Sequence, residues 1–142
     1  MDTVPAYQTG RRRLRNLVLT ACLILGLAPN ATAERGFPYG TELMLDAKPM
    51  KGSKRVPMLV IGPQGDASVE GWCNTVKAHL VVADDTLTIL TGAKTEQQCA
   101  AERMRGDSDL FAALLEVTHW RQEGDVLTLR GPKMLRFRTL TN

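Results

Sequence analysis

The sequence predicts a mainly β protein with a single amphipathic helix. After residue 40, most of the chain consists of short runs that are apolar throughout or that alternate apolar with polar residues, and Gly, Pro and Asp separate these runs. Such runs are typical of antiparallel strands joined by turns. One segment instead repeats its apolar residues at helical spacing. The expected strands cover residues 41–47, 56–62, 67–73, 76–82, 86–92, 125–131 and 133–139, and the expected helix covers residues 106–117.

Alternation is clearest in residues 76–82, where Val76 and Leu80 fall on one face of the expected strand. Lys77 and His79 fall on the opposite face. Because the apolar face is the one that packs on a core, we expect His79 to face solvent.

The last two expected strands form a hairpin that turns at Gly131 and Pro132. An earlier turn is expected at residues 123–125, after the short run His119 to Gln122.

For the second strand of the last hairpin, the sequence does not decide which residues face the core. Either Met134 or Leu135 lies on the apolar side with Phe137, depending on the register of the strand pair.

The expected helix begins with residues that favour a helix start. Asp107 or Ser108 can accept the free backbone N–H groups of the first turn. Further along, a stripe of apolar residues recurs at helical spacing, and such a stripe usually packs on a sheet. The stripe consists of Leu110, Leu114 and Val117.

The N-terminus has the layout of a secretory signal peptide. Four arginines between residues 11 and 15 precede an apolar run at 17–28, and small residues Ala31 and Ala33 follow. The apolar run of 12 residues is shorter than the roughly 20 residues that a spanning helix needs. We therefore expect a signal peptide at residues 1–33, cleavage after Ala33, and a single domain at residues 34–142 with no membrane span.

An alternative cleavage site lies inside the apolar run. The residues "LTAC", which end at Cys22, resemble the site at which bacterial lipoproteins are cut and lipidated. Cleavage after Ala33 predicts a periplasmic or secreted protein, whereas processing at Cys22 predicts a lipid-anchored one.

The charge of the whole chain comes from the expected signal peptide. Residues 1–33 hold four of the 18 basic residues and one of the 15 acidic residues, so 14 of each remain in residues 34–142. A net charge of zero gives no reason to expect nucleic acid or acidic lipid as a partner.

Two cysteines remain after the expected cleavage, Cys73 and Cys99. An even number of cysteines in an oxidising compartment favours a disulfide between them. A redox site would more typically show a C-x-x-C spacing, and a zinc site would need further ligands, for which only His79 and His119 are present. We expect neither a metal nor a cofactor.

Several short motifs occur in a fixed order along the chain. They are Gly71, Cys73 and Asn74 in "GWCN", residues 87–90, Thr95 with Cys99, residues 110–120 and residues 124–138. In this order they resemble the META domain family, also called HslJ-like. Trp72 stands where this family usually has glycine, and Val76 begins a stretch where it usually has an aromatic residue followed by glycine.

The resemblance implies an antiparallel lipocalin-like barrel or strongly curved sheet with one helix. It also implies an exported or envelope-anchored domain, often associated with stress responses, without common catalytic residues. We therefore expect a non-catalytic domain that binds a protein partner or a small apolar ligand. The alternative is a thiol-dependent enzyme or redox sensor that uses Cys73. At the "GWCN" motif, Trp72 and Asn74 are candidates for a surface site or for packing, with packing favoured for Trp72.

Overall fold

The computed structural model describes residues 36–140 of the chain. The expected signal peptide, with Ala31, Ala33 and Cys22, lies outside the described residues. Within residues 36–140, no helix is long and apolar enough to cross a membrane.

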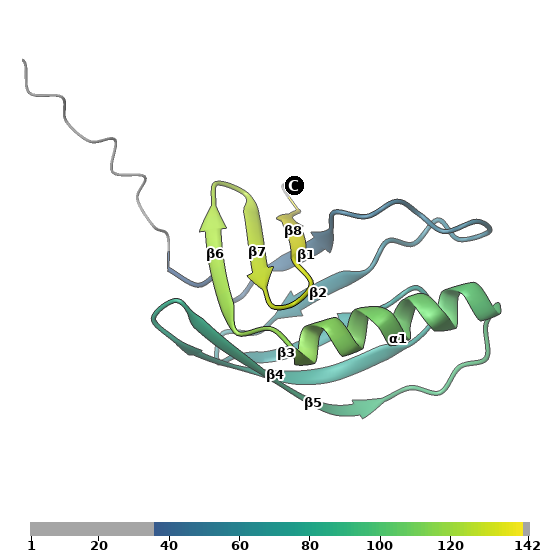
Figure 1. Ribbon diagram of the computed structural model, residues 1–142, viewed down its shortest axis with the longest axis horizontal. Helices are drawn as coiled ribbons and strands as arrows, with labels where there is room; N and C mark the ends of the chain where they lie inside the picture. The colour runs from purple at the N-terminus through teal and green to yellow at the C-terminus, as the bar shows by residue number, and fades with distance from the viewer. Residues whose placement is uncertain (1–35, 141–142) are drawn as a thin grey trace, which may run out of the picture. The chain divides into compact units, whose positions relative to one another are not determined.

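Eight strands form a closed barrel in which every strand is antiparallel to its neighbours (Figure 1). Each strand pairs with the next one along the chain, and the last pairs with the first. The mainly β prediction is therefore confirmed, and of its two forms the barrel is the correct one. The strands are β1 (Glu42–Leu45), β2 (Met58–Ile61), β3 (Asp66–Glu70), β4 (Thr75–Ala83), β5 (Thr86–Lys94), β6 (His119–Glu123), β7 (Val126–Arg130) and β8 (Leu135–Thr139).

Inward-facing residues of the strands fill the interior of the barrel. Phe137 of β8 is fully buried and lies opposite Leu45 of β1 on one side and Leu127 of β7 on the other. This register also decides the open alternative in β8, because Leu135 is buried while Met134 is 60% exposed.

The β4–β5 hairpin has the alternation that the sequence predicts. Val76 and Leu80 are buried, while Lys77 and His79 are exposed. His79 lies 3.4 Å from the carboxylate of Asp66 on the outer surface, so its predicted exposure is confirmed.

One strand prediction was wrong at its end. Residues 67–73 were expected to be a single strand, but β3 ends at Glu70 and the following residues form a loop before β4. Cys73 therefore lies in this loop and not in a strand.

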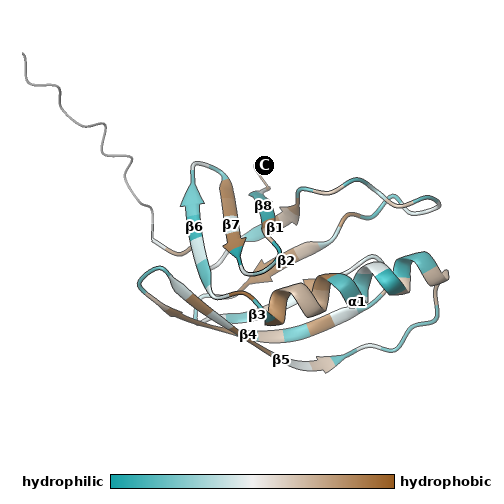
Figure 2. Ribbon diagram, viewed as in Figure 1, coloured by the Kyte–Doolittle hydropathy of each residue, from teal (hydrophilic) through white to brown (hydrophobic). Residues whose placement is uncertain are grey.

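A single helix in residues 36–140, α1 (Ala101–Leu115), connects β5 to β6 and lies along the barrel (Figure 1). β5 and β6 are joined by only one residue pair, Thr86 with His119, and the helix packs beside β5. The C-terminal half of α1 is its apolar half (Figure 2). There Leu110 and Leu114 are buried, as the sequence predicts.

The predicted start of the helix was wrong. α1 begins at Ala101, and neither Asp107 nor Ser108 caps it, because Ala100 precedes the helix without a side-chain hydrogen bond. Residues 101–105 contain strong helix formers, which extend the helix toward its N-terminus. Asp107 consequently lies within the helix, where it is only 3% exposed. Val117 is buried but lies beyond the end of the helix.

Candidate functional site

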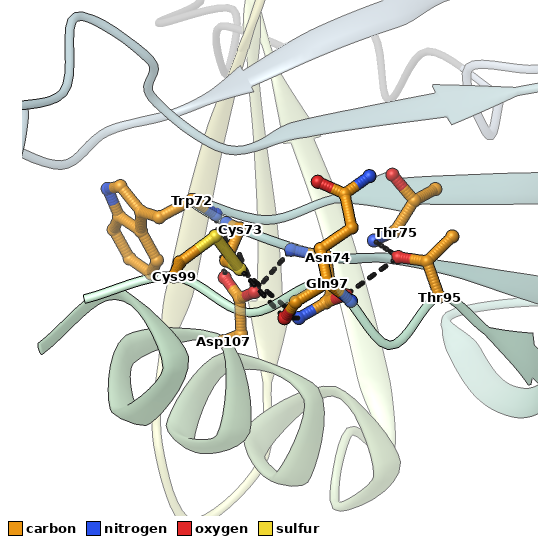
Figure 3. The surroundings of a disulfide bond; sticks show 8 residues. All are labelled: Trp72, Cys73, Asn74, Thr75, Thr95, Gln97, Cys99 and Asp107. Atoms are coloured by element: carbon orange, nitrogen blue, oxygen red, sulfur yellow. Dashed lines mark hydrogen bonds between the residues drawn. A yellow bond between two sulfur atoms is a disulfide. The ribbon is translucent and has the colours of Figure 1, made fainter. Parts of the chain in front are cut away.

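Cys73 and Cys99 form a disulfide bond (Figure 3). Their Cα atoms are 6.1 Å apart, which is within the usual range for a disulfide. Cys73 lies in the loop between β3 and β4, and Cys99 lies two residues before α1. The bond therefore attaches the start of the helix to the β3–β4 loop.

Asp107 attaches the same helix to the same loop by hydrogen bonds (Figure 3). Its carboxylate accepts the backbone N–H groups of Trp72 at 2.6 Å, Cys73 at 3.1 Å and Asn74 at 2.6 Å. Successive N–H groups that point at one anion form a nest, and here a side chain of the protein occupies it. Gly71 is needed beside it, because a Cβ atom at that position would collide with the Asp107 carboxylate.

The side chain of Asn74 attaches the β3–β4 loop to the loop that precedes α1. Its Oδ1 accepts the hydroxyl of Thr95 at 2.8 Å and the backbone N–H of Gln97 at 2.7 Å, and its Nδ2 donates to the carbonyl of Gln97 at 3.3 Å. The amide thus uses both its donor and its acceptor inside the protein. We name residues 71–74, 95–99 and Asp107 together the polar corner.

Trp72 packs between the barrel and the helix. Its side chain is 9% exposed, and a Cβ atom at position 106 would lie 3.0 Å from Cε3 of its ring. The same Cβ atom would collide with Met50. This close approach accounts for a glycine inside α1, where glycine normally lowers stability. Packing, the favoured interpretation of Trp72, is thus what its burial supports.

A groove lies between α1 and the ends of β1 and β8, and we name it the α1 groove. Its volume is about 400 Å³, within the range of roughly 300 to 1,000 Å³ typical of small-molecule sites. Buried apolar side chains of all three elements line it, together with Trp72. These side chains are Leu45, Leu110 and Leu135.

The rim of the α1 groove combines two methionines with charged residues. Met134 is 60% exposed, whereas Met50 is partly buried against the core. Both signs of charge are present at the rim, from Asp46, Asp109, Lys133 and Arg136. The groove can therefore hold an apolar group while polar groups at its edge remain in water.

The residues considered as metal ligands do not come together. His79 pairs with Asp66, whereas His119 contacts the hydroxyl of Thr118. Within residues 36–140, no group of three or more His, Cys, Asp or Glu side chains is arranged to hold a metal ion.

Sequence reasoning identified part of the polar corner and missed the rest. It paired the cysteines and singled out Trp72 and Asn74. It did not find the role of Asp107, because an aspartate after glycine near an apolar stripe is typical of a helix start. It also did not find the α1 groove, since residues from four separate segments form it.

The described residues thus form a small antiparallel barrel domain, in which one disulfide and one buried carboxylate hold the only described helix. The META domain family model matches residues 40–141 of this chain. The chain therefore belongs to the META domain family, and the resemblance seen in the sequence is confirmed.

Solved structures support the same fold. An NMR structure of a protein from Burkholderia xenovorans is 17% identical to this chain with a TM-score of 0.59, and the match covers 73% of this chain and 84% of that one. A second NMR structure is 18% identical with a TM-score of 0.55, and the match covers 70% of this chain and 88% of that one. At such identities the similarity shows the fold alone. No curated protein matches the chain.

Proposed function

We propose that this protein is a non-catalytic META domain of the bacterial envelope that binds a protein partner or a small apolar ligand in the α1 groove. The observation that carries the proposal is the groove itself, whose walls are buried Leu45, Leu110 and Leu135. Concave sites of this kind, apolar inside and polar at the edge, are where proteins most often bind ligands.

A non-catalytic role agrees with how the polar side chains of the polar corner are used. Cys73 is bonded to Cys99, so its sulfur is not a free nucleophile in this oxidised state. The carboxylate of Asp107 and the amide of Asn74 both bond to the protein's own backbone. These groups therefore stabilise the polar corner, and a catalytic role would require them to give up the bonds that do so.

Export to the periplasm is the second component of the proposal. It is supported by the basic residues, the apolar run and the small residues Ala31 and Ala33 near the N-terminus. The disulfide fits an oxidising compartment.

N-terminal sequencing of the exported protein is expected to begin at Glu34. A start at an acylated Cys22 would contradict this cleavage and make the domain membrane-anchored. A role in stress responses is part of the proposal, and its only support is the association of the META domain family with such responses.

Site-specific photo-crosslinking tests the binding site. A photoreactive residue in place of Met134, which is 60% exposed at the groove rim, is expected to crosslink to a discrete partner or ligand in cells. The matched control carries the same residue in place of Leu90, which is 55% exposed on β5, away from the groove.

The result is read as a difference between these two positions. Crosslinks from position 134 that excess unlabelled protein removes, without the same product from position 90, support the α1 groove. Identical products from both positions, or none from position 134, would refute it.

A further inference from the structure

The loop between β1 and β2 carries a concentration of positive charge. Lys48, Lys51, Lys54 and Arg55 lie within eight residues, and the sequence has no acidic residue between positions 47 and 65. All four side chains are exposed. We name residues 48–55 the basic loop.

Within residues 36–140, the basic loop is not paired with acids. The ion pairs of the described residues involve His79, Arg121 and Arg138, and none of them includes a cation of the basic loop. The balanced charge of residues 34–142 therefore conceals an uneven distribution. A net charge of zero argues against a uniformly basic surface, but it does not argue against a local one.

The basic loop is anchored beside the α1 groove. Met50, in the middle of the loop, is partly buried and lies against α1 at Gly106, where a Cβ atom would collide with it. Met50 also lines the groove. Packing of Met50 thus fixes the loop on the helix while its lysines remain in solvent.

Two further cations lie at the rim of the groove. Lys133 and Arg136 line it on either side of the exposed Met134. Of the two acids at the rim, Asp46 lies 3.7 Å from Arg138, so its charge is already partly balanced. The basic loop, which reaches the groove through Met50, and the groove rim together carry six cations, and the acids that line the groove are Asp46 and Asp109.

We propose that the basic loop, together with Lys133, Met134 and Arg136, is a docking surface for an anionic phospholipid bilayer. Clusters of four or more lysines and arginines bind anionic lipid surfaces. An exposed methionine among them can enter the headgroup region, where an apolar side chain is stabilised. This inference adds a membrane to the envelope location of the proposed function, on which it rests.

A bilayer fits the basic loop better than an acidic protein segment does. The loop cations are exposed one by one along an irregular segment, and none of them lines the α1 groove, the recess that could position individual carboxylates. A lipid surface presents dense charge without fixed positions, so it does not need such a recess. Attraction of this kind is screened by salt.

Vesicle sedimentation tests the docking surface. The protein is purified in the form that expressing cells accumulate, and its N-terminus is sequenced. It is then mixed with phosphatidylcholine vesicles that contain either no phosphatidylglycerol or roughly 30% of it, which gives the vesicles a negative surface potential. We expect binding to the anionic vesicles that 0.5 M NaCl, at which the screening length is only about 4 Å, removes.

Two variants of equal net charge distinguish the effect of the basic loop on vesicle binding from the effect of the protein's total charge. The loop variant carries Lys48→Gln, Lys51→Gln, Lys54→Gln and Arg55→Gln, and its partition coefficient is expected to fall roughly fivefold for each cation removed. The control variant carries Lys77→Gln, Lys94→Gln, Arg121→Gln and Arg130→Gln, all exposed on other strands, and is expected to bind nearly as well as the unchanged protein. Equal thermal melting of both variants shows that folding is intact.

Three results would overturn the docking surface. These are equal losses in the two variants, equal binding to vesicles with and without phosphatidylglycerol, and loop-dependent binding to polyglutamate without binding to vesicles, which would favour an acidic protein partner. If vesicle binding fails while crosslinking at position 134 succeeds, the proposed function stands without the membrane. The reverse pattern would refute the groove and keep the docking surface.

Discussion

The two halves of α1 are attached to the barrel in different ways. The N-terminal half is held at the polar corner by the disulfide of Cys99 with Cys73 and by the carboxylate of Asp107 (Figure 3). The C-terminal half, which is the apolar half (Figure 2), is held by apolar packing. Leu114 in this half is fully buried. The first kind of attachment is directional and the second is not.

Because of this difference, the attachment that fixes the position of α1 is not the same as the one that stabilises the fold through buried apolar area. Apolar contacts contribute free energy in proportion to the area that they bury, but they tolerate small displacements of a helix. Hydrogen bonds to three successive N–H groups do not, because their strength falls steeply with distance and angle. The polar corner therefore sets where α1 lies along the barrel, and with it the geometry of the α1 groove.

Loss of the Asp107 carboxylate is expected to have the largest effect. Asp107→Ala leaves the backbone N–H groups of Trp72, Cys73 and Asn74 without their acceptor in a buried site. Because each buried unpaired group costs about 1 to 3 kcal/mol, we expect the free energy of unfolding to fall by about 4 kcal/mol or more. Urea unfolding followed by circular dichroism measures it.

Asp109→Ala is the matched control, because Asp109 is an exposed aspartate of the same helix. It is expected to change the free energy of unfolding by less than about 0.5 kcal/mol. Similar losses in the two variants would show that helix charge, and not the nest at the β3–β4 loop, explains the effect.

Opening the disulfide is expected to have the next largest effect. The two cysteines are 26 residues apart in sequence, and closing a loop of this length stabilises a protein by about 3.5 kcal/mol in the chain-entropy model. Cys73→Ser and Cys99→Ser should lower the free energy of unfolding by similar amounts, as should a reductant with the unchanged protein.

A specific pattern would contradict this account of the disulfide. If Cys73→Ser were much more destabilising than Cys99→Ser, packing of Cys73, which is 7% exposed, would outweigh the cross-link. If the reductant had no effect on stability, the nest and the Asn74 hydrogen bonds alone would hold the polar corner.

Truncation of the apolar half tests the other attachment. Leu114→Ala removes a side chain that is 0% exposed, and we expect a loss of about 3 kcal/mol in the free energy of unfolding. Leu115→Ala, next to it but 56% exposed, should lose less than about 0.5 kcal/mol. Equal losses would mean that helix propensity, and not burial, determines the result.

The sequence predicted the barrel well and the α1 groove not at all, for a physical reason. Alternation in a strand such as β4 is a local pattern, and so is the stripe of Leu110 and Leu114. The role of Asp107 depends on residues more than 30 positions away, with which it shares no local pattern. Its likeness to a helix cap placed the predicted helix start five residues after the observed one at Ala101.

Asn74 is expected to give the smallest effect, although it belongs to the polar corner. Its side-chain bonds to Thr95 and Gln97 are exposed, so water can replace the amide when it is removed. Asn74→Ala is therefore expected to lower the free energy of unfolding by only about 1 to 1.5 kcal/mol. Asn74→Asp should retain the two acceptor bonds, but it should lose the bond donated to the Gln97 carbonyl and place a carboxylate oxygen against that carbonyl.

Hydrogen exchange locates the effect of Asn74→Ala as well as measuring it. We expect faster exchange at the N–H of Gln97, which bonds to Asn74 Oδ1, and unchanged exchange at the N–H groups that Asp107 binds. Faster exchange at both sets would mean that Asn74 and Asp107 act as one cooperative unit. In that case the Asn74 hydrogen bonds would be needed to keep the N–H groups of the β3–β4 loop on the Asp107 carboxylate.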